Sequence, residues 1–142
     1  MAEKIKVHRD LRVYQQAFDT AVQIFELSKA FPAEERYSLT DQIRRSSRSV
    51  CANLAEAWRK RRYERAFISK LSDVEAEAAE TQVWIEFGAK FGYLSRDDAN
   101  EIYLAYDGIL RTIVGMINHP ETWVIGDQKR LEEDAESYGL PF

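Results

Sequence analysis

Apolar side chains recur at alternating steps of three and four residues along four segments of the chain, which is the period of one helix face. This pattern predicts helices over residues 12–30, 39–59, 63–91 and 96–117. The predicted inward stripe of the first helix is Leu11, Tyr14, Phe18, Ala21, Phe25 and Ser28. That of the second is Leu39, Ile43, Ser47, Val50, Leu54 and Ala57. The third and fourth stripes are Phe67, Leu71, Val74, Ala78, Thr81, Ile85 and Gly88, and then Ile102, Tyr106, Ile109, Ile113 and Ile117.

Start and stop signals lie at the ends of these segments. The first and last helices end before prolines, Pro32 and Pro120, because the residue before a proline is disfavoured in the α region. Serine and aspartate have N-cap spacing before the second and fourth helices, as Ser38 with Asp41 and Ser95 with Asp98. Gly92 suits a left-handed C-cap. Between the second and third helices the run WRKRRYER holds no turn-forming residue, so one long bent helix is also allowed.

Four amphipathic helices with short connections bury their stripes most simply as an all-α, antiparallel up-down-up-down four-helix bundle. We assign residues 1–120 to this bundle. Residues 121–142 form a short, partly ordered acidic tail with Glu121, Asp127, Glu132, Glu133, Asp134 and Glu136. An apolar group near its start is predicted to anchor the tail on the bundle: Trp123, Val124 and Ile125.

Composition places the chain in the ordinary globular class. Its 142 residues are 45% hydrophobic and 31% charged, and they include one cysteine, so no disulfide can form within the chain. No apolar run is long enough to span a membrane, and the first residues lack the apolar segment of a signal peptide. We therefore expect a cytoplasmic protein of one domain with no membrane contact.

The net charge of −4 hides a strongly basic stretch. Residues 44–65 contain only two acidic residues and eight basic ones, Arg44, Arg45, Arg48, Arg59, Lys60, Arg61, Arg62 and Arg65. Those in the second helix share one outward arc, which is what neutralising a phosphate backbone requires. Two other interpretations stay open. The stripe can be a solvated helix face, or its arginines can pair with the acidic tail or with acids of the third helix, Asp73, Glu75, Glu77 and Glu80.

The end of the third helix is apolar nearly all round, because Val83, Trp84, Phe87 and Phe91 project away from its core stripe. Such a surface needs a cover, which is either another subunit or the tail through Trp123. We favour self-association. On the second helix, small or amide residues lie on one flank and allow close helix packing: Gln42, Ser46, Ser49 and Asn53. Asn53 is predicted to make buried hydrogen bonds between helices.

Catalytic and metal-binding patterns are weak. The two histidines, His8 and His119, belong to no metal-ligand motif, and no phosphate-binding glycine loop occurs. Cys51 lies beside the apolar stripe and is predicted to be a small buried residue. Glu77 and Glu80, one turn apart, fit a surface role better than acid–base chemistry. We expect no enzymatic activity, no cofactor and no metal.

The stretch YSLTDQIRRSSRSVCANLAE, residues 37–56, resembles the signature of the four-helix-bundle proteins related to those encoded in 23S rRNA intervening sequences. VYQQA, FPAEE, the segment around Glu77–Gln82 and FGYL match in the same order, so the resemblance covers residues 10–118. Ala57 replaces the usual glycine, and RKRRYER replaces a more loop-like linker. Family-type positions are Gln42, Arg44, Arg45, Ser49, Asn53 and Glu56. Of these we assign Gln42, Ser49, Asn53 and Glu56 structural roles.

The resemblance implies an up-down-up-down bundle, a ring-shaped homopentamer in several relatives, and nucleic-acid binding. Accessory proteins of diversity-generating retroelements are similar in architecture and assist a reverse transcriptase and its RNA. The predicted function is thus a non-enzymatic oligomeric accessory protein that binds RNA or DNA. Few aromatics lie among the arginines in sequence, apart from Trp58 and Tyr63, so recognition of backbone and shape is expected. The alternative is a scaffold or protein-interaction module without nucleic acid.

Overall fold

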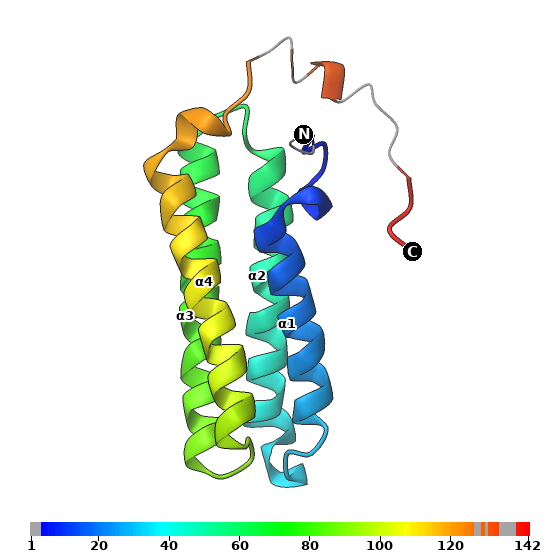
Figure 1. The fold of residues 1–142 in the computed structure, drawn as a ribbon, viewed down its shortest axis with the longest axis vertical. Helices are drawn as coiled ribbons and strands as arrows, with labels where there is room; N and C mark the ends of the chain where they lie inside the picture. The colour runs from blue at the N-terminus through cyan, green and yellow to red at the C-terminus, as the bar shows by residue number, and fades with distance from the viewer. Residues whose placement is uncertain (1–3, 127–128, 130, 134–138) are drawn as a thin grey trace.

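Four long helices run antiparallel to their sequence neighbours (Figure 1). The structure is a computed structural model that describes residues 4–126, 129, 131–133 and 139–142. The helices are α1 (Arg12–Ser28), α2 (Asp41–Arg59), α3 (Glu64–Lys90) and α4 (Arg96–Asn118). Short helical turns stand beside them: η1 (His8–Asp10), η2 (Ala33–Glu35), η3 (Arg36–Thr40) and η4 (Pro120–Thr122). The described part of the chain contains no strand, so the predicted all-α up-down-up-down bundle is confirmed.

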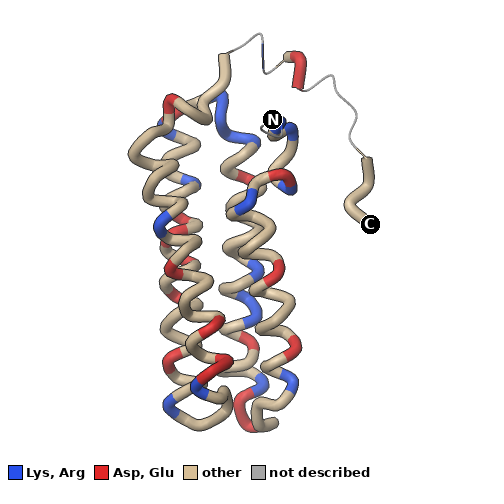
Figure 2. Tube along the Cα trace, in the orientation of Figure 1, with Lys and Arg blue, Asp and Glu red and all other residues tan. Residues whose placement is uncertain are grey.

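A clean turn separates α2 from α3. Residues 60–63 leave the helix, the Lys60 amide bonds the Ala57 carbonyl at 3.0 Å, and the Tyr63 amide bonds the Lys60 carbonyl at 3.1 Å. The long bent helix that the sequence allowed is therefore not formed. This turn brings the most basic part of the chain to one end of the bundle (Figure 2).

Two of the three predicted caps are confirmed. Ser95 Oγ accepts a hydrogen bond from the Asp98 amide at 3.1 Å, and Gly92 takes the left-handed conformation with φ of 77°. The Ser38 prediction is wrong, because α2 begins after a π-helical turn. Ser38 Oγ instead donates a hydrogen bond to the Glu35 carboxylate at 2.6 Å. Its side chain therefore does not cap the backbone amides at the start of α2.

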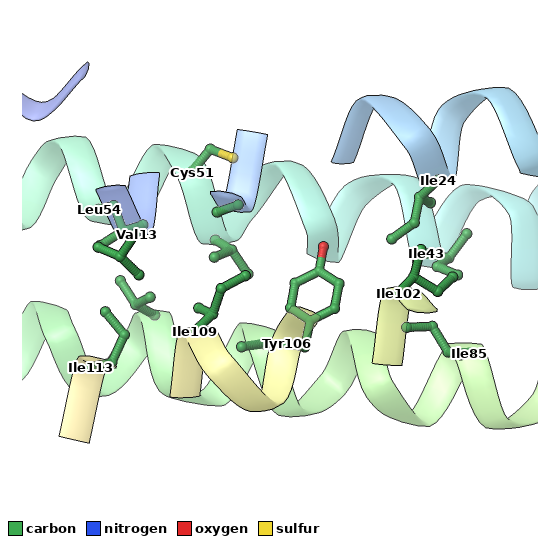
Figure 3. Packing of buried hydrophobic residues seen from close by; sticks show 14 of the residues in the cluster. Val13, Ile24, Ile43, Cys51, Leu54, Ile85, Ile102, Tyr106, Ile109 and Ile113 are labelled. Atoms are coloured by element: carbon green, nitrogen blue, oxygen red, sulfur yellow. The ribbon is translucent and has the colours of Figure 1, made fainter. Parts of the chain in front are cut away.

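The predicted stripes of α2 and α3 are buried without exception, and Ile117 is the only member of the α4 stripe that is half-buried rather than buried (Figure 3). The α1 stripe is wrong in its middle part, because Leu11 and Ser28 are buried as predicted but Tyr14, Ala21 and Phe25 are only half-buried. The structure buries Val13, Ala17, Thr20 and Ile24. Phe18, predicted to point inward, is 50% exposed. A shift of one residue rotates a helix by about 100°, and the smaller side chains fit the space against α2 and α4.

Polar contacts tie the helices together at positions that differ from those predicted. Thr81 Oγ1 donates to Ser46 Oγ at 2.8 Å between α3 and α2. Gln82 Nε2 donates to the Asp107 carboxylate at 2.9 Å between α3 and α4. Asn53 is half-buried rather than buried, and the buried contact on this flank is made two flank positions earlier, by Ser46.

The start of the tail packs on the α2–α3 end of the bundle. The Trp123 ring lies edge-on to Trp58 with centroids 6.3 Å apart, and the Ile125 amide donates to the Arg61 carbonyl at 3.1 Å. The anchor predicted from Trp123 is thus present. Three of the tail acids, Asp127, Asp134 and Glu136, lie outside the described residues. No helix within the described residues is long and apolar enough to cross a membrane.

Candidate nucleic-acid interface

The eight basic residues of the predicted stripe lie along α2 and around the α2–α3 turn (Figure 2). Six have exposed side chains: Arg45, Arg48, Arg59, Lys60, Arg62 and Arg65. Arg44 is half-buried and Arg61 is buried. The stripe is therefore a real surface feature, with two members drawn into the fold.

Arg61 is a structural residue rather than an exposed cation. Only 4% of it is exposed, and its guanidinium stacks 3.4 Å from the centre of the Trp58 ring. Its Nε donates to the Trp58 carbonyl at 2.7 Å, and its Nη2 pairs with the Glu133 carboxylate at 2.6 Å. The prediction that Arg61 contacts nucleic acid is corrected, because its donors are used inside the protein.

Arg44 and Arg48 frame the ring of Phe25 on α1. The Arg44 guanidinium lies 4.8 Å from the ring centroid, and that of Arg48 lies 5.8 Å away. Arg44 Nε also donates to Ser28 Oγ at 2.7 Å. These contacts hold both arginines against α1 before any ligand binds. Less side-chain entropy is therefore lost when they bind a phosphate.

Two hollows of the surface follow the stripe. The first basic groove, about 590 Å³, is lined among others by Arg36, Tyr37, Arg44, Arg45 and Arg48. The second basic groove, about 660 Å³, lies at the α2–α3 turn and is lined among others by Arg59, Lys60, Arg62, Tyr63 and Lys70. Sequence reasoning missed Arg36 and Lys70, because they lie outside the contiguous basic run.

Acidic side chains near the stripe have their own partners. Lys70 Nζ bridges Glu56 at 2.6 Å and Asp73 at 3.6 Å, and the hydrogen bond to Glu56 raises the pKa of Lys70. Glu56 thus links α2 to α3. Glu80 accepts a hydrogen bond from Trp84 Nε1 at 3.3 Å. The sequence left open that arginines of the basic stripe pair with acidic residues of the tail. Arg61 and Glu133 form such an ion pair.

Besides Glu56, three residues of α2 were predicted to have structural roles, and they lie at the surface of the packed helices. Gln42, Ser49 and Asn53 are half-buried, and Ser49 lines the first basic groove.

The second apolar surface forms a row of neighbouring aromatic rings at the C-terminal end of α3. Ring centroids lie 6.0 Å apart for Trp84 and Phe87, and 5.7 Å apart for Phe87 and Phe91. Val83, Phe87 and Phe91 are exposed, and Trp84 is half-buried. Trp123 packs at the opposite end of the bundle, so it does not cover this row (Figure 1).

Two candidate catalytic groups have pKa values raised by burial. Cys51 is buried beside α1, and burial raises the pKa of its thiol to about 11 (Figure 3). The pKa of Glu77 is raised by burial and by the neighbouring charge of Glu80. No cluster of metal-ligating side chains occurs among the residues that the structure describes.

Comparisons with known proteins agree with this architecture. A family model described as 23S rRNA-intervening sequence protein matches residues 9–115, well over half of the chain. A crystal structure of a protein of unknown function from the S23 ribosomal protein family of Bacteroides thetaiotaomicron VPI-5482 is similar, with a TM-score of 0.67 and 29% identity. The match covers 74% of this chain and 97% of that one. A search of curated proteins finds no match. The chain belongs to the 23S rRNA-intervening sequence protein family.

Proposed function

We propose that this protein is a non-enzymatic accessory protein that binds RNA or DNA through the basic face of α2 and the α2–α3 turn. The observation that carries the proposal is the set of six exposed cations on that face, flanked by two grooves that Arg36 and Lys70 extend. Each phosphate that such a cation neutralises releases condensed counterions, so the gain is electrostatic and independent of sequence. The partner is a polyanion contacted mainly through its backbone.

Self-association makes this modest surface effective. We propose a homo-oligomer, with a pentamer favoured, joined partly through Val83, Trp84, Phe87 and Phe91. The exposed row of rings at the end of α3 supports this, because contiguous exposed apolar surface is typical of interfaces. Several copies of one basic face raise avidity for a long polyanion without new contacts. A reverse transcriptase or another protein that works on the same nucleic acid is a compatible partner.

Binding to structured RNA and duplex DNA across a salt series tests the proposal. Affinity should fall steeply between about 50 and 200 mM salt, with a log–log slope of several units. A variant with Arg45→Glu, Arg48→Glu and Arg62→Glu should lose binding while its helix content and mass stay unchanged. The matched control carries Lys90→Glu, Arg96→Glu and Arg111→Glu, three exposed cations outside the proposed surface.

The second candidate is a scaffold that binds an acidic protein surface. The exposed rings of α3 are compatible with this role as well. Absence of salt-sensitive binding by the wild-type protein at about 50 mM salt would reject nucleic acid as the partner. The scaffold would then be the better interpretation of the basic face.

A further inference from the structure

The two basic grooves are joined by a third hollow with a different lining. This apolar groove, about 500 Å³, lies between α1 and α2, with walls that include Tyr14, Phe18, Val22 and Phe25. It shares Arg48 and Ala52 with the first basic groove and Ala55 with the second. The three hollows therefore lie next to one another along α2, and we call them together the track. Alanines at 52 and 55 keep the middle of this track open between the cationic ends.

Exposed aromatic rings occur in every part of the track. Tyr37 is 84% exposed in the first basic groove, Phe18 is 50% exposed in the apolar groove, and Tyr63 is 65% exposed in the second basic groove. An aromatic ring left in water does not gain the free energy of burial. The alternation of exposed rings with cations along the track therefore needs a reason. The sequence hides this arrangement, because Phe18 and Tyr37 come from α1 and η3.

We propose that this track binds single-stranded nucleic acid, with bases stacked on Tyr37, Phe18 and Tyr63 and phosphates held by the flanking arginines. The inference rests on the proposed function and specifies its ligand. Base–aromatic stacking beside a cationic groove is the usual way to hold an unpaired strand, and it tolerates any base because every base has a π-face. A duplex stacks its bases on one another, so it would use the cations and leave the aromatic rings in water.

Charge along the track also favours a strand of phosphates over an acidic peptide. The acidic residues that line the three hollows are Asp41 in the first basic groove and Glu56 in the second. Glu56 is already paired with Lys70 at 2.6 Å. The cations stand at both ends of this face, at Arg44–Arg48 and again from Arg59, and the distance from Arg44 to Arg59 is a rise of roughly 22 Å along the helix. At about 3.4 Å per stacked nucleotide this length accommodates roughly six nucleotides.

Fluorescence anisotropy with two labelled probes tests the inference. One probe is a deoxythymidine oligomer of about twelve nucleotides, and the other is a duplex of the same length. We expect the single strand to bind at least tenfold more tightly at equal salt. Tyr37→Ala and Tyr63→Ala should each weaken single-strand binding roughly 5- to 100-fold and change duplex binding less than about twofold. Tyr37→Phe and Tyr63→Phe keep the ring and should bind nearly as the wild type.

The salt series separates stacking from charge. Arg48→Gln should reduce the log–log salt slope by about one unit, because one phosphate contact is lost. Tyr37→Ala should leave the slope unchanged and lower affinity equally at every salt concentration. Leu104→Ala removes an exposed apolar side chain on α4, outside the three hollows, and is the matched control.

Failure of this inference differs from failure of the proposed function. Salt-sensitive binding with equal or tighter affinity for the duplex would overturn the single-strand proposal and keep the nucleic-acid one. The same conclusion would follow if Tyr37→Ala and Tyr63→Ala bound the oligomer as tightly as the wild type. Binding of neither probe at about 50 mM salt would overturn both.

Discussion

The guanidinium of Arg61 lies 3.4 Å from the centre of the Trp58 ring, inside the most basic run of the chain. Two nitrogens of the same guanidinium donate hydrogen bonds, Nε to the Trp58 carbonyl and Nη2 to the Glu133 carboxylate. One arginine thus closes the C-terminal end of α2, holds a tryptophan ring and attaches the tail. A planar, always charged side chain with a fork of donors is suited to this combination, and lysine is not.

Replacing Arg61 should destabilise the fold while replacing its neighbour should not. Arg61→Ala removes the ion pair to the partly buried Glu133 carboxylate and uncovers Trp58, so we expect a loss of about 3 kcal/mol in the free energy of unfolding. Arg62→Ala, at an exposed position, should stay within about 0.5 kcal/mol of the wild type. Urea unfolding followed by circular dichroism measures both. Equal stabilities for the two variants would contradict the structural role of Arg61.

The same substitution at two glycines should have opposite effects. Gly92 has φ of 77° at the end of α3, so Gly92→Ala is strained and should cost about 1 kcal/mol. Gly115 lies inside α4, and a methyl group there would meet nothing within 4 Å. Gly115→Ala should therefore stabilise the protein by about 0.5 to 1 kcal/mol. Thermal unfolding of the two variants gives the signs, and a gain at Gly92 would refute the strain argument.

The core of α2, α3 and α4 could be predicted from sequence because one apolar stripe runs the length of each helix, and the further apolar side chains of α3 are confined to its C-terminal end. α1 carries two adjacent stripes, one with Val13 and Ala17 and one with Tyr14 and Phe18. Hydrophobicity alone favours the aromatic stripe, whereas close packing against two neighbouring helices selects the smaller side chains. The choice depends on inter-helix distance, which no single helix pattern contains.

The candidate site was predictable in the same uneven way. Helical spacing placed Arg45 and Arg48 together on an outward arc, as the structure has them. Arg61 looked like its neighbours, because the direction of a side chain in a turn is not periodic and its partner Glu133 is 72 residues away. Tyr37 joins the arginines only through the helical turn of η3.

Stability should decline at alkaline pH through Cys51. Burial raises the pKa of the folded thiol from an ordinary value of 9.0 to about 11. Between these values the unfolded chain releases a proton that the folded protein still holds, so unfolding becomes easier as pH rises. The shift corresponds to about 2 to 3 kcal/mol at most. Cys51→Ala has no thiol proton to release. Between pH 8 and pH 11 the free energy of unfolding of the wild type should therefore fall by that amount relative to the variant.

Urea unfolding at the two pH values gives this difference directly. Comparison with the variant is needed because burial also raises the pKa of Tyr106 in both proteins, and only the part of that shift caused by the Cys51 charge differs between them. A stability difference that does not change with pH would show that the Cys51 thiol ionises normally in the folded state.

The exposed rings at the end of α3 should determine the mass of the protein in solution. Light scattering at micromolar concentration is expected to give several times the 16.5 kDa of one chain. A variant with Phe87→Glu and Phe91→Glu should shift to a single chain with unchanged helix content, because both rings are exposed within one protomer and charge at a desolvated interface is costly. Leu104→Glu, an exposed position on α4, is the matched control and should keep the wild-type mass. A wild-type protein that is monomeric at this concentration would contradict the interface, and the row of rings would then be open surface on a single bundle.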